Sequence, residues 1–292
     1  MTKFKILIPV GLLVLALLLG SGSAMAQSIT WVDSMTISGL SADGSVAAGN
    51  STDGLYEACR WDAVGGVVRL GRSSTAAIGR SAGIPGISAD GNAISSTIIS
   101  SDTLATQGIW TKGVGWVETM PPPPADGGSL DDSYGSAWGI SGDGLSVVGF
   151  YWRPGASDGT AHCSIAQGPG TVVDLGSQGR DSRANGADHD GNVVVGWSAS
   201  PTISVWQPTV WEDGVMTVLT ETVLWCDAWQ TNSAGNMVVG CTSDTLSYSL
   251  PMSSAALWIR TETGWQEQIL GVLPGTFSNG VGYVTDNDLS DC

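Results

Sequence analysis

One hydrophobic pattern recurs along the chain: an apolar run, a short polar turn ending in glycine, and a second apolar run. Residues 137–149, AWGISGDGLSVVG, are the clearest copy. Asp before Gly is typical of a tight β-turn, because glycine adopts positive φ without a Cβ clash and Asp bonds nearby backbone. Each copy therefore predicts a β-hairpin with structural turn residues. These are Asp43, Gly44, Asp90, Gly91, Asp143, Gly144, Asp190, Gly191 and Gly235.

Two further signals follow each turn. The first is a short apolar strand, which carries a tryptophan in four copies, and the second is a glycine followed by another strand. Units of about 47 residues with about four short strands are typical of β-propeller blades. We predict an all-β fold, a β-propeller of about five to six four-stranded blades, in one repeat domain over residues 27–292. The units run roughly over residues 36–79, 80–131, 132–179, 180–223, 224–274 and, in part, 275–292.

The two ends of the repeat region bear on ring closure. Residues 30–35, TWVDSM, resemble the fourth strand of the other units, so we predict that this N-terminal strand closes the last blade and removes a free sheet edge. Residues 277–284, FSNGVGYV, resemble the start of a sixth unit. Either the last blade is assembled from both ends, or it is incomplete because the sequence belongs to a longer protein.

The N-terminus follows a different pattern. Lys3 and Lys5 precede the apolar run 6–19, and small residues then lead to Ala26, which is the order of a secretory signal peptide. A membrane-spanning helix needs about 20 apolar residues, more than this run provides. We expect residues 1–26 to be a signal peptide cleaved after Ala26. The mature chain is then secreted, on the cell surface or periplasmic, without membrane insertion.

Composition narrows the range of partners. The chain has 11 Lys and Arg residues against 27 Asp and Glu residues, with a formal net charge of −16. Phosphate backbones repel such a chain, so we predict no nucleic-acid partner. Only 13% of residues are charged, while 41 are glycine and 13 are tryptophan, which indicates a folded chain with many turns. We expect a monomer without a cofactor.

Motifs for catalysis and metal binding are weak. Residues 79–83 fit the GxSxG pattern, but Pro85 and Gly86 prevent the helix that a nucleophile elbow requires. Asp188 and His189 lie in a repeat turn, where polar residues are expected for the turn itself and do not indicate a metal site. No cluster with ligand-type spacing surrounds them. We therefore predict neither catalytic residues nor a metal site.

Cysteines in an exported chain indicate disulfides. If residues 232–235 form a four-residue loop, continuing the strand pairing outward places Cys226 opposite Cys241. Cross-strand neighbours at that separation can be bridged, so we predict a Cys226–Cys241 disulfide. Cys59 and Cys163 occupy matching positions in different units, and we predict that they are buried thiols.

The repeat resembles the HAF family of bacterial extracellular repeats, whose units read roughly HAFLW…G…DLG…A.GIS.DG..VVG. Matching segments include EACRW with GGVVRLG, GTVVDLG followed by ANGADHDGNVVVG, and AWGISGDGLSVVG. The resemblance covers residues 36–284. It implies an exported, propeller-like repeat protein and supplies no catalytic residues. The chain departs from the pattern because only His162 keeps the family histidine and Ala234 replaces Asp before Gly235.

The loops indicate where a binding face would lie. In a propeller, the connections between second and third strands share a face with the connections between blades, and here those connections vary in length. Variable loops on a rigid scaffold usually carry function. Five aromatic residues fall on this face outside the repeat phase: Phe150, Tyr151, Trp152, Trp197 and Trp206. We predict that they form an exposed patch that binds protein or glycan; alternatively, they cap the core beneath long loops.

Three functions are compatible with these features. The first, which we predict, is an exported non-catalytic repeat protein that binds protein or glycan through the variable loops. The second is a secreted propeller-type glycoside hydrolase with paired carboxylates near the axis, although the sequence singles out no such pair. The third is a purely structural surface repeat.

Overall fold

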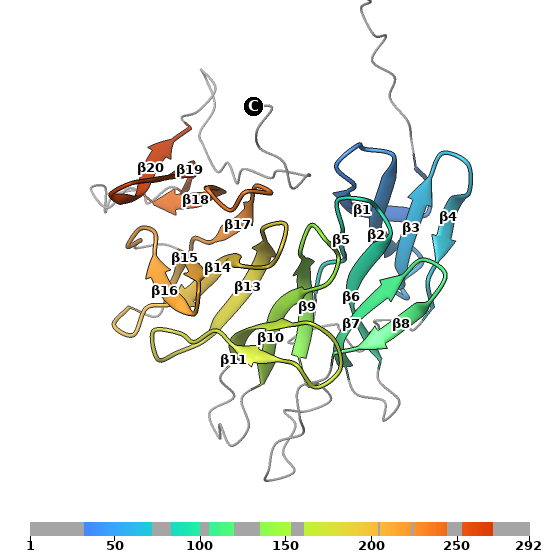
Figure 1. The fold of residues 1–292 in the computed structure, drawn as a ribbon, viewed down its shortest axis with the longest axis horizontal. Helices are drawn as coiled ribbons and strands as arrows, with labels where there is room; N and C mark the ends of the chain where they lie inside the picture. Colours follow the sequence, from blue (N-terminus) through green and yellow to red (C-terminus); the bar gives the residue numbers. More distant parts are fainter. Residues whose placement is uncertain are drawn as a thin grey trace, which may run out of the picture. The chain divides into compact units, whose positions relative to one another are not determined.

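The computed structural model describes residues 32–71, 83–99, 105–119, 135–152, 161–203, 205–222, 225–243 and 253–270. These residues form five four-stranded antiparallel sheets (Figure 1). In every sheet, strands that are neighbours in the chain are neighbours in space. Contacts group residues 33–292, which include all five sheets, into one unit. Among the described residues, no helix is long and apolar enough to cross a membrane.

The strand bounds follow the predicted repeat. The first sheet contains β1 (Met35–Leu40), β2 (Val46–Ser51), β3 (Ala58–Asp62) and β4 (Gly66–Arg69). The second contains β5 (Gly86–Ile87), β6 (Ala93–Ile99), β7 (Ala105–Thr111) and β8 (Gly115–Glu118). The third contains β9 (Gly135–Ile140), β10 (Val147–Trp152), β11 (Ala161–Ala166) and β12 (Val173–Asp174). The fourth contains β13 (Ser182–Ala187), β14 (Val193–Ala199), β15 (Trp206–Glu212) and β16 (Val215–Val218). The fifth contains β17 (Ala228–Thr231), β18 (Met237–Ser243), β19 (Ser253–Thr261) and β20 (Gly264–Ile269).

The predicted all-β, multi-blade fold is confirmed, with one sheet for each of the five complete units. The predicted closing strand is wrong where the structure describes it, because residues 32–34 form coil and turn, and Met35 already pairs with Ser51 in the first sheet. Ser34 has a φ of 70°, which interrupts an extended chain. The partial unit 275–292 and the signal peptide lie outside the described residues.

The core lies between consecutive sheets. Each of four apolar clusters takes its buried residues from two neighbouring sheets, so each blade buries its faces against the next. Trp211 and Trp258, from the tryptophan position of the repeat, are fully buried in two of these clusters. Large rings at that position therefore pack neighbouring blades together, as expected of repeated core residues.

The hairpin turns are linked from blade to blade. The amide of Ala42 donates to the carbonyl of Ala89 at 2.9 Å, Ala89 to Gly142 at 2.8 Å, and Gly142 to Asp188 at 3.1 Å. His189 continues the series by donating to Ser233, at 3.1 Å. The repeated turn therefore does more than reverse the chain, because it also joins each blade to the following one.

A β-bulge recurs in the first strand of four sheets. The pairing between first and second strand shifts by one residue at Ser38, Trp138, Asn185 and Trp229. Opposite each shift stands a glycine of the second strand, and a Cβ on any of these glycines would overlap a carbonyl oxygen of the first strand or of the residue just before it. A bulge re-aims the extra residue. In these four sheets, the glycines thus make room for a bulge. The bulged residue is therefore not bound to the regular alternation of side chains between the two faces of the sheet.

Candidate functional site

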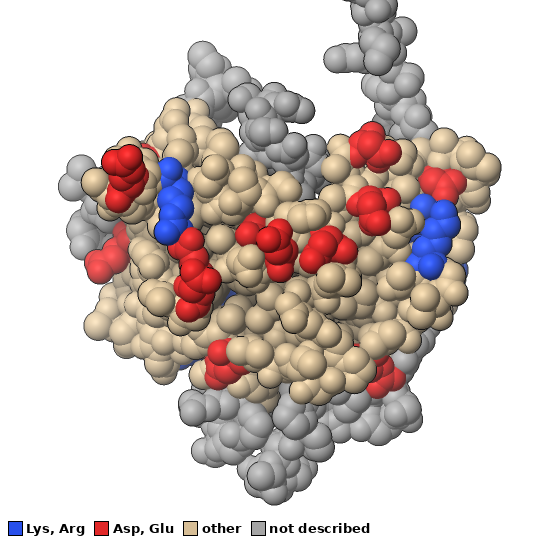
Figure 2. Space-filling model, in the orientation of Figure 1, with Lys and Arg blue, Asp and Glu red and all other residues tan. Residues whose placement is uncertain are grey.

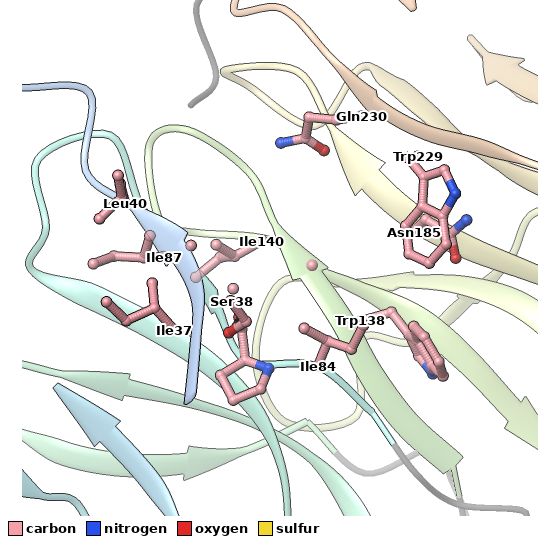
Figure 3. A pocket seen from close by; sticks show the side chains of 14 residues that line it. Ile37, Ser38, Leu40, Ile84, Ile87, Trp138, Ile140, Asn185, Trp229 and Gln230 are labelled. Carbon is pink, nitrogen blue, oxygen red and sulfur yellow. Dashed lines mark hydrogen bonds between the residues drawn. The ribbon is translucent and has the colours of Figure 1, made fainter. Parts of the chain in front are cut away.

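The bulged residues meet at a cavity of about 390 Å³ (Figure 3). Every sheet contributes its first strand or the residues just before it. One repeat position supplies a lining side chain from each blade, and four residue types occur there, in chain order Ser38, Pro85, Trp138, Asn185 and Trp229. Pockets of several hundred Å³ at such convergence points are the usual sites for ligands.

The cavity wall is mainly apolar. In addition to the two tryptophans and Pro85, the lining carries five aliphatic side chains: Ile37, Leu40, Ile84, Ile87 and Ile140. Glycines at the adjoining repeat position bring the backbone close to the cavity in three blades: Gly39, Gly86 and Gly139. No Asp, Glu, Lys or Arg is among the described residues that line it. The cavity therefore offers contact area rather than acid–base chemistry.

Two polar side chains of the wall are bonded to the protein itself. Ser38 Oγ donates to the Pro85 carbonyl at 2.6 Å. Asn185 Oδ1 accepts from Arg183 Nε at 2.8 Å, while Asn185 Nδ2 donates to the Ala228 carbonyl at 2.8 Å and to Asp227 Oδ2 at 3.2 Å. Both N–H groups of the Asn185 amide are thus engaged within the fold, which leaves little unsatisfied polarity facing a ligand.

Arg183 lies behind the wall and holds it in place. Its guanidinium stacks on the Trp138 ring, 3.5 Å from the ring centroid, and its Nη2 lies 3.5 Å from Asp227 Oδ2. The Trp138 indole N–H donates to Ser136 Oγ at 2.9 Å. Trp138 is therefore fixed through one ring face and through its indole nitrogen, which makes it a rigid platform.

Burial affects both charges of this pair. Arg183 and Asp227 are 8% and 6% exposed. Burial lowers the pKa of Arg183 to about 10, with Asp227 acting in the opposite direction, so the arginine stays cationic at neutral pH. Burial also raises the pKa of Asp227, against the lowering effect of Arg183 and of the hydrogen bonds it receives. Each charge thus depends on its partner to remain inside the fold.

The predicted aromatic patch is only partly exposed. Phe150 and Trp197 are each 6% exposed, so the prediction that these two rings form an exposed surface is wrong. Phe150 packs edge-on against Trp152 at 5.3 Å, while Trp197 stacks on Trp206 at 4.4 Å. Packing against neighbouring rings buries side chains that the loop position alone would expose. Tyr151, Trp152 and Trp206 are half-buried.

Sequence reasoning missed an exposed ring beside this group. Trp225 is 59% exposed and packs edge-on against Trp206 at 4.8 Å. The sequence offered one signal for this ring, because Trp225 does not occupy the tryptophan position of the repeat. Arg183 also lies 5.4 Å from the Trp197 ring centroid and 5.6 Å from that of Trp206, so it contacts both the cavity platform and this second aromatic group.

The half-buried Tyr151 shares a polar cluster with His162 and Asp174. Tyr151 Oη donates to Asp174 Oδ2 at 3.0 Å, and His162 Nδ1 lies 3.0 Å from the same oxygen. Burial would raise the pKa of Asp174, but hydrogen bonds from His162, the Gly176 amide and Tyr151 outweigh it and lower the pKa to about 2. This arrangement stabilises the Asp174 carboxylate.

The turn carboxylates have local partners. Asp43, Asp90 and Asp143 each accept a hydrogen bond from the serine two residues earlier, at 2.7, 2.6 and 2.5 Å. Each also accepts from the backbone amide two residues later, at 2.9 Å. Asp190 accepts from Asn192 Nδ2 at 3.3 Å. These contacts give the residues a structural role in the turns, and the described residues contain no His, Cys, Asp and Glu group suited to a metal ion.

The four cysteines among the described residues are thiols in this structure. Cys59, Cys163, Cys226 and Cys241 are buried and free. The predicted strand register beside Cys226 is wrong, because Thr231 pairs with Val238 and a bulge follows, so Asp227 bonds to the Cys241 amide instead. Cys226 nevertheless hydrogen-bonds to Cys241 through its side chain, and this bond together with burial raises the pKa of Cys226. The disulfide between them stays a prediction.

The structure bears on two motifs that the sequence analysis set aside. Of the GxSxG segment 79–83, only Gly83 is described, and it lies outside any strand. His189 is exposed in its turn. Its backbone takes part in the series of bonds between turns.

Comparisons with known proteins give information on the fold. No family model matches the chain, and no curated protein matches it. Among solved structures, TolB from Acinetobacter baumannii is similar, with a TM-score of 0.52 and 17% identity over 80% of this chain and 54% of that one. The putative TolB from Agrobacterium tumefaciens has a TM-score of 0.51 and 17% identity over 80% of this chain and 79% of that one. The chain thus spans about half the length of the first of these proteins, and the similarity shows the β-propeller fold alone.

Proposed function

We propose that this chain is an exported, non-catalytic β-propeller repeat protein that binds a partner molecule in the cavity between its first strands. The observation that carries the proposal is the variable repeat position at the cavity. Glycines and turn residues recur to build the blades, whereas the repeat position at the cavity carries four residue types, with tryptophan in two of the five blades. Variation at a position where all five blades converge favours recognition over a purely structural repeat.

The chemistry of the wall favours binding over hydrolysis. Glycoside hydrolases use a pair of carboxyl groups on either side of the scissile bond. The described lining supplies no carboxylate, and Asp227, in the cluster behind the wall, is engaged by Arg183 and Asn185. A ligand in this cavity would therefore meet a fixed aromatic platform and aliphatic side chains, without a proton donor aimed at it.

Export and family are part of the proposal. The charge and small-residue pattern of residues 1–26 supports a signal peptide, and the repeat pattern supports a relationship to HAF-type extracellular proteins. The fold shared with the two TolB structures is compatible with a location outside the cytoplasm. A monomer suffices for this function, because one chain supplies the whole described cavity wall.

The test compares two tryptophan variants of the exported chain on peptide and glycan arrays. Trp138→Ala removes the cavity platform, while Trp225→Ala removes an exposed ring that does not line the cavity. We expect the wild type and Trp225→Ala to bind the same ligands and Trp138→Ala to bind them at least tenfold more weakly, since stacked rings dominate such contacts. Thermal unfolding of each variant controls for folding.

Two outcomes would contradict this assignment. If Trp138→Ala bound as the wild type does while Trp225→Ala and Trp206→Ala lost binding, the site would be the aromatic group next to the loops. Turnover of any polysaccharide in a panel of glycosidase assays would overturn the non-catalytic assignment. Trp229→Ala provides a second cavity variant that leaves the stack of Arg183 on Trp138 in place.

A further inference from the structure

The polar groups of the cavity wall decide which ligand chemistry it accepts. Ser38 and Asn185 are already bonded inside the fold, and the remaining described side chains are aliphatic or aromatic apart from Gln230. A sugar would bring several hydroxyl groups, and each one buried without a partner costs about 1–3 kcal/mol. An apolar group in the same place carries no hydroxyl groups to bury, and it gains contact with the rings of Trp138 and Trp229. The wall therefore favours an apolar ligand group over a glycan.

Acidic turns follow three of the chain segments that line the cavity. Leu40, Ile87 and Ile140 line the cavity, and each directly precedes the serine of a hairpin turn. Asp43 and Asp90, two residues further into those turns, are exposed, and Asp143 is half-exposed in the third. In three consecutive blades, a carboxylate therefore follows a residue of the apolar wall after three positions in the chain.

Hydrogen bonds in the turns keep Asp43 and Asp90 ionised at neutral pH. The hydrogen bond from Ser41 lowers the pKa of Asp43 to about 2, with help from the amide and hydroxyl of Ser45. The hydrogen bond from Ser88 lowers the pKa of Asp90. Figure 2 shows acidic side chains spread over the face in view, with few basic ones among them. Arg60 reaches the Gly91 carbonyl in the second turn, but its charge is paired with Asp62.

We infer that the ligand is a segment of another protein that inserts an apolar side chain into the cavity and places Lys or Arg against the turn carboxylates. This inference rests on the proposed function. The volume of about 390 Å³ fits one or two large side chains rather than a folded element. The net charge of −16 attracts a basic segment over a distance, which raises its association rate.

The test uses three labelled hexapeptides in fluorescence anisotropy titrations of the full exported chain. The first has two central leucines flanked by lysines, the second replaces the lysines with glutamates, and the third replaces the leucines with serines. We expect the first to bind at least tenfold more tightly than either of the others, and its affinity to fall as salt is added. The third peptide controls for unspecific attraction of any cation to this acidic chain.

Two matched variants locate the binding. Asp143→Asn keeps an oxygen for the bonds from Ser141 and the Leu145 amide but removes the charge, so the turn is preserved. We expect it to weaken the lysine–leucine peptide several-fold. Asp213→Asn, in the exposed outer hairpin of the fourth sheet, should leave binding unchanged. Trp138→Ala should abolish the preference for leucine over serine.

The outcomes separate this inference from the proposed function. Equal binding of the lysine and glutamate peptides, with Trp138→Ala still weakening both, would overturn the charge requirement and leave the cavity as the site. A glycan that competes with the peptide or binds more tightly would overturn the apolar segment as ligand. If no peptide bound and Trp138→Ala changed nothing on either array, the proposed function itself would fail.

Discussion

Gly44 and Gly144 occupy the same position of the repeat but have different surroundings. Both have positive φ, 68° and 76°. A Cβ on Gly44 would meet no atom within 4 Å, whereas a Cβ on Gly144 would lie 2.7 Å from the Cβ of Ala93 in the preceding blade. Gly144 is therefore required for two reasons: the backbone is left-handed at this position, and the preceding blade leaves no space for a Cβ.

The two glycines give a matched pair of substitutions. Gly44→Ala should reduce the free energy of unfolding by about 1 kcal/mol, because only the backbone is strained. Gly144→Ala should cost about 1–3 kcal/mol more, because the new methyl group also overlaps the second sheet. Urea unfolding followed by tryptophan fluorescence measures the difference. Equal losses would show that the contact between blades is not what requires glycine at this turn.

The Arg183–Asp227 pair predicts a pH-dependent loss of stability. Arg183→Met leaves Asp227 buried without its cation, which should cost about 3–5 kcal/mol at neutral pH. The pKa of Asp227 is already raised by burial and should rise further without Arg183. A carboxyl whose pKa is higher in the folded than in the unfolded state destabilises the fold as pH rises from about 4 through its folded pKa. The defect should therefore be small near pH 4 and grow toward pH 7.

Chemical unfolding at several pH values checks this expectation. The double variant Arg183→Met with Asp227→Asn serves as the control, since it removes both charges and should show no such trend between pH 4 and pH 7. A defect in Arg183→Met that is the same at every pH would mean that lost stacking on Trp138, and not the unpaired carboxylate, causes the destabilisation.

At the scale of the element, the hairpin turn is more than a local feature. Ala42, Ala89 and Gly142 lie in turns, yet their amides donate to carbonyls of the next blade. We expect these amides to exchange hydrogen slowly, because exchange requires neighbouring blades to separate. The amides of Val64 and Val114, in outer hairpin turns with only local acceptors, should exchange much faster. Hydrogen exchange followed by NMR measures the rates of both groups of amides. Equal rates would contradict the idea that the hydrogen bonds between turns hold neighbouring blades together.

The element scale also explains which part of the site could be predicted. The hairpins, the strand count and the turn residues follow from local patterns, and the structure places one sheet in each complete unit. The cavity residues were missed because Trp138, Asn185 and Trp229 lie inside the repeated first strand and look like ordinary strand positions. The signal was present, since the residue at that one position changes from each unit to the next, while glycine, alanine or isoleucine stand beside it in most of them.

At the scale of the whole molecule, the cavity belongs to no single blade. No sheet supplies more than four of its lining residues, and Arg183 of the fourth sheet fixes Trp138 of the third while it is paired with Asp227, just before the fifth. Binding in the cavity is therefore sensitive to how consecutive blades pack, and the expected effects of Trp138→Ala and Asp143→Asn depend on that packing.

The sequence by itself determined the repeat, the all-β fold and the chemistry of the turns, because each depends on residues close together in the chain. Only the tertiary structure decided which side chains converge. A bulge moves Trp138 and its equivalents by one position out of strand alternation, and whether that residue faces solvent, core or cavity depends on the neighbouring blade. For the same reason, Phe150 and Trp197 were expected to be exposed because of their place near variable loops. In the structure, both are buried, and each packs against a neighbouring tryptophan ring.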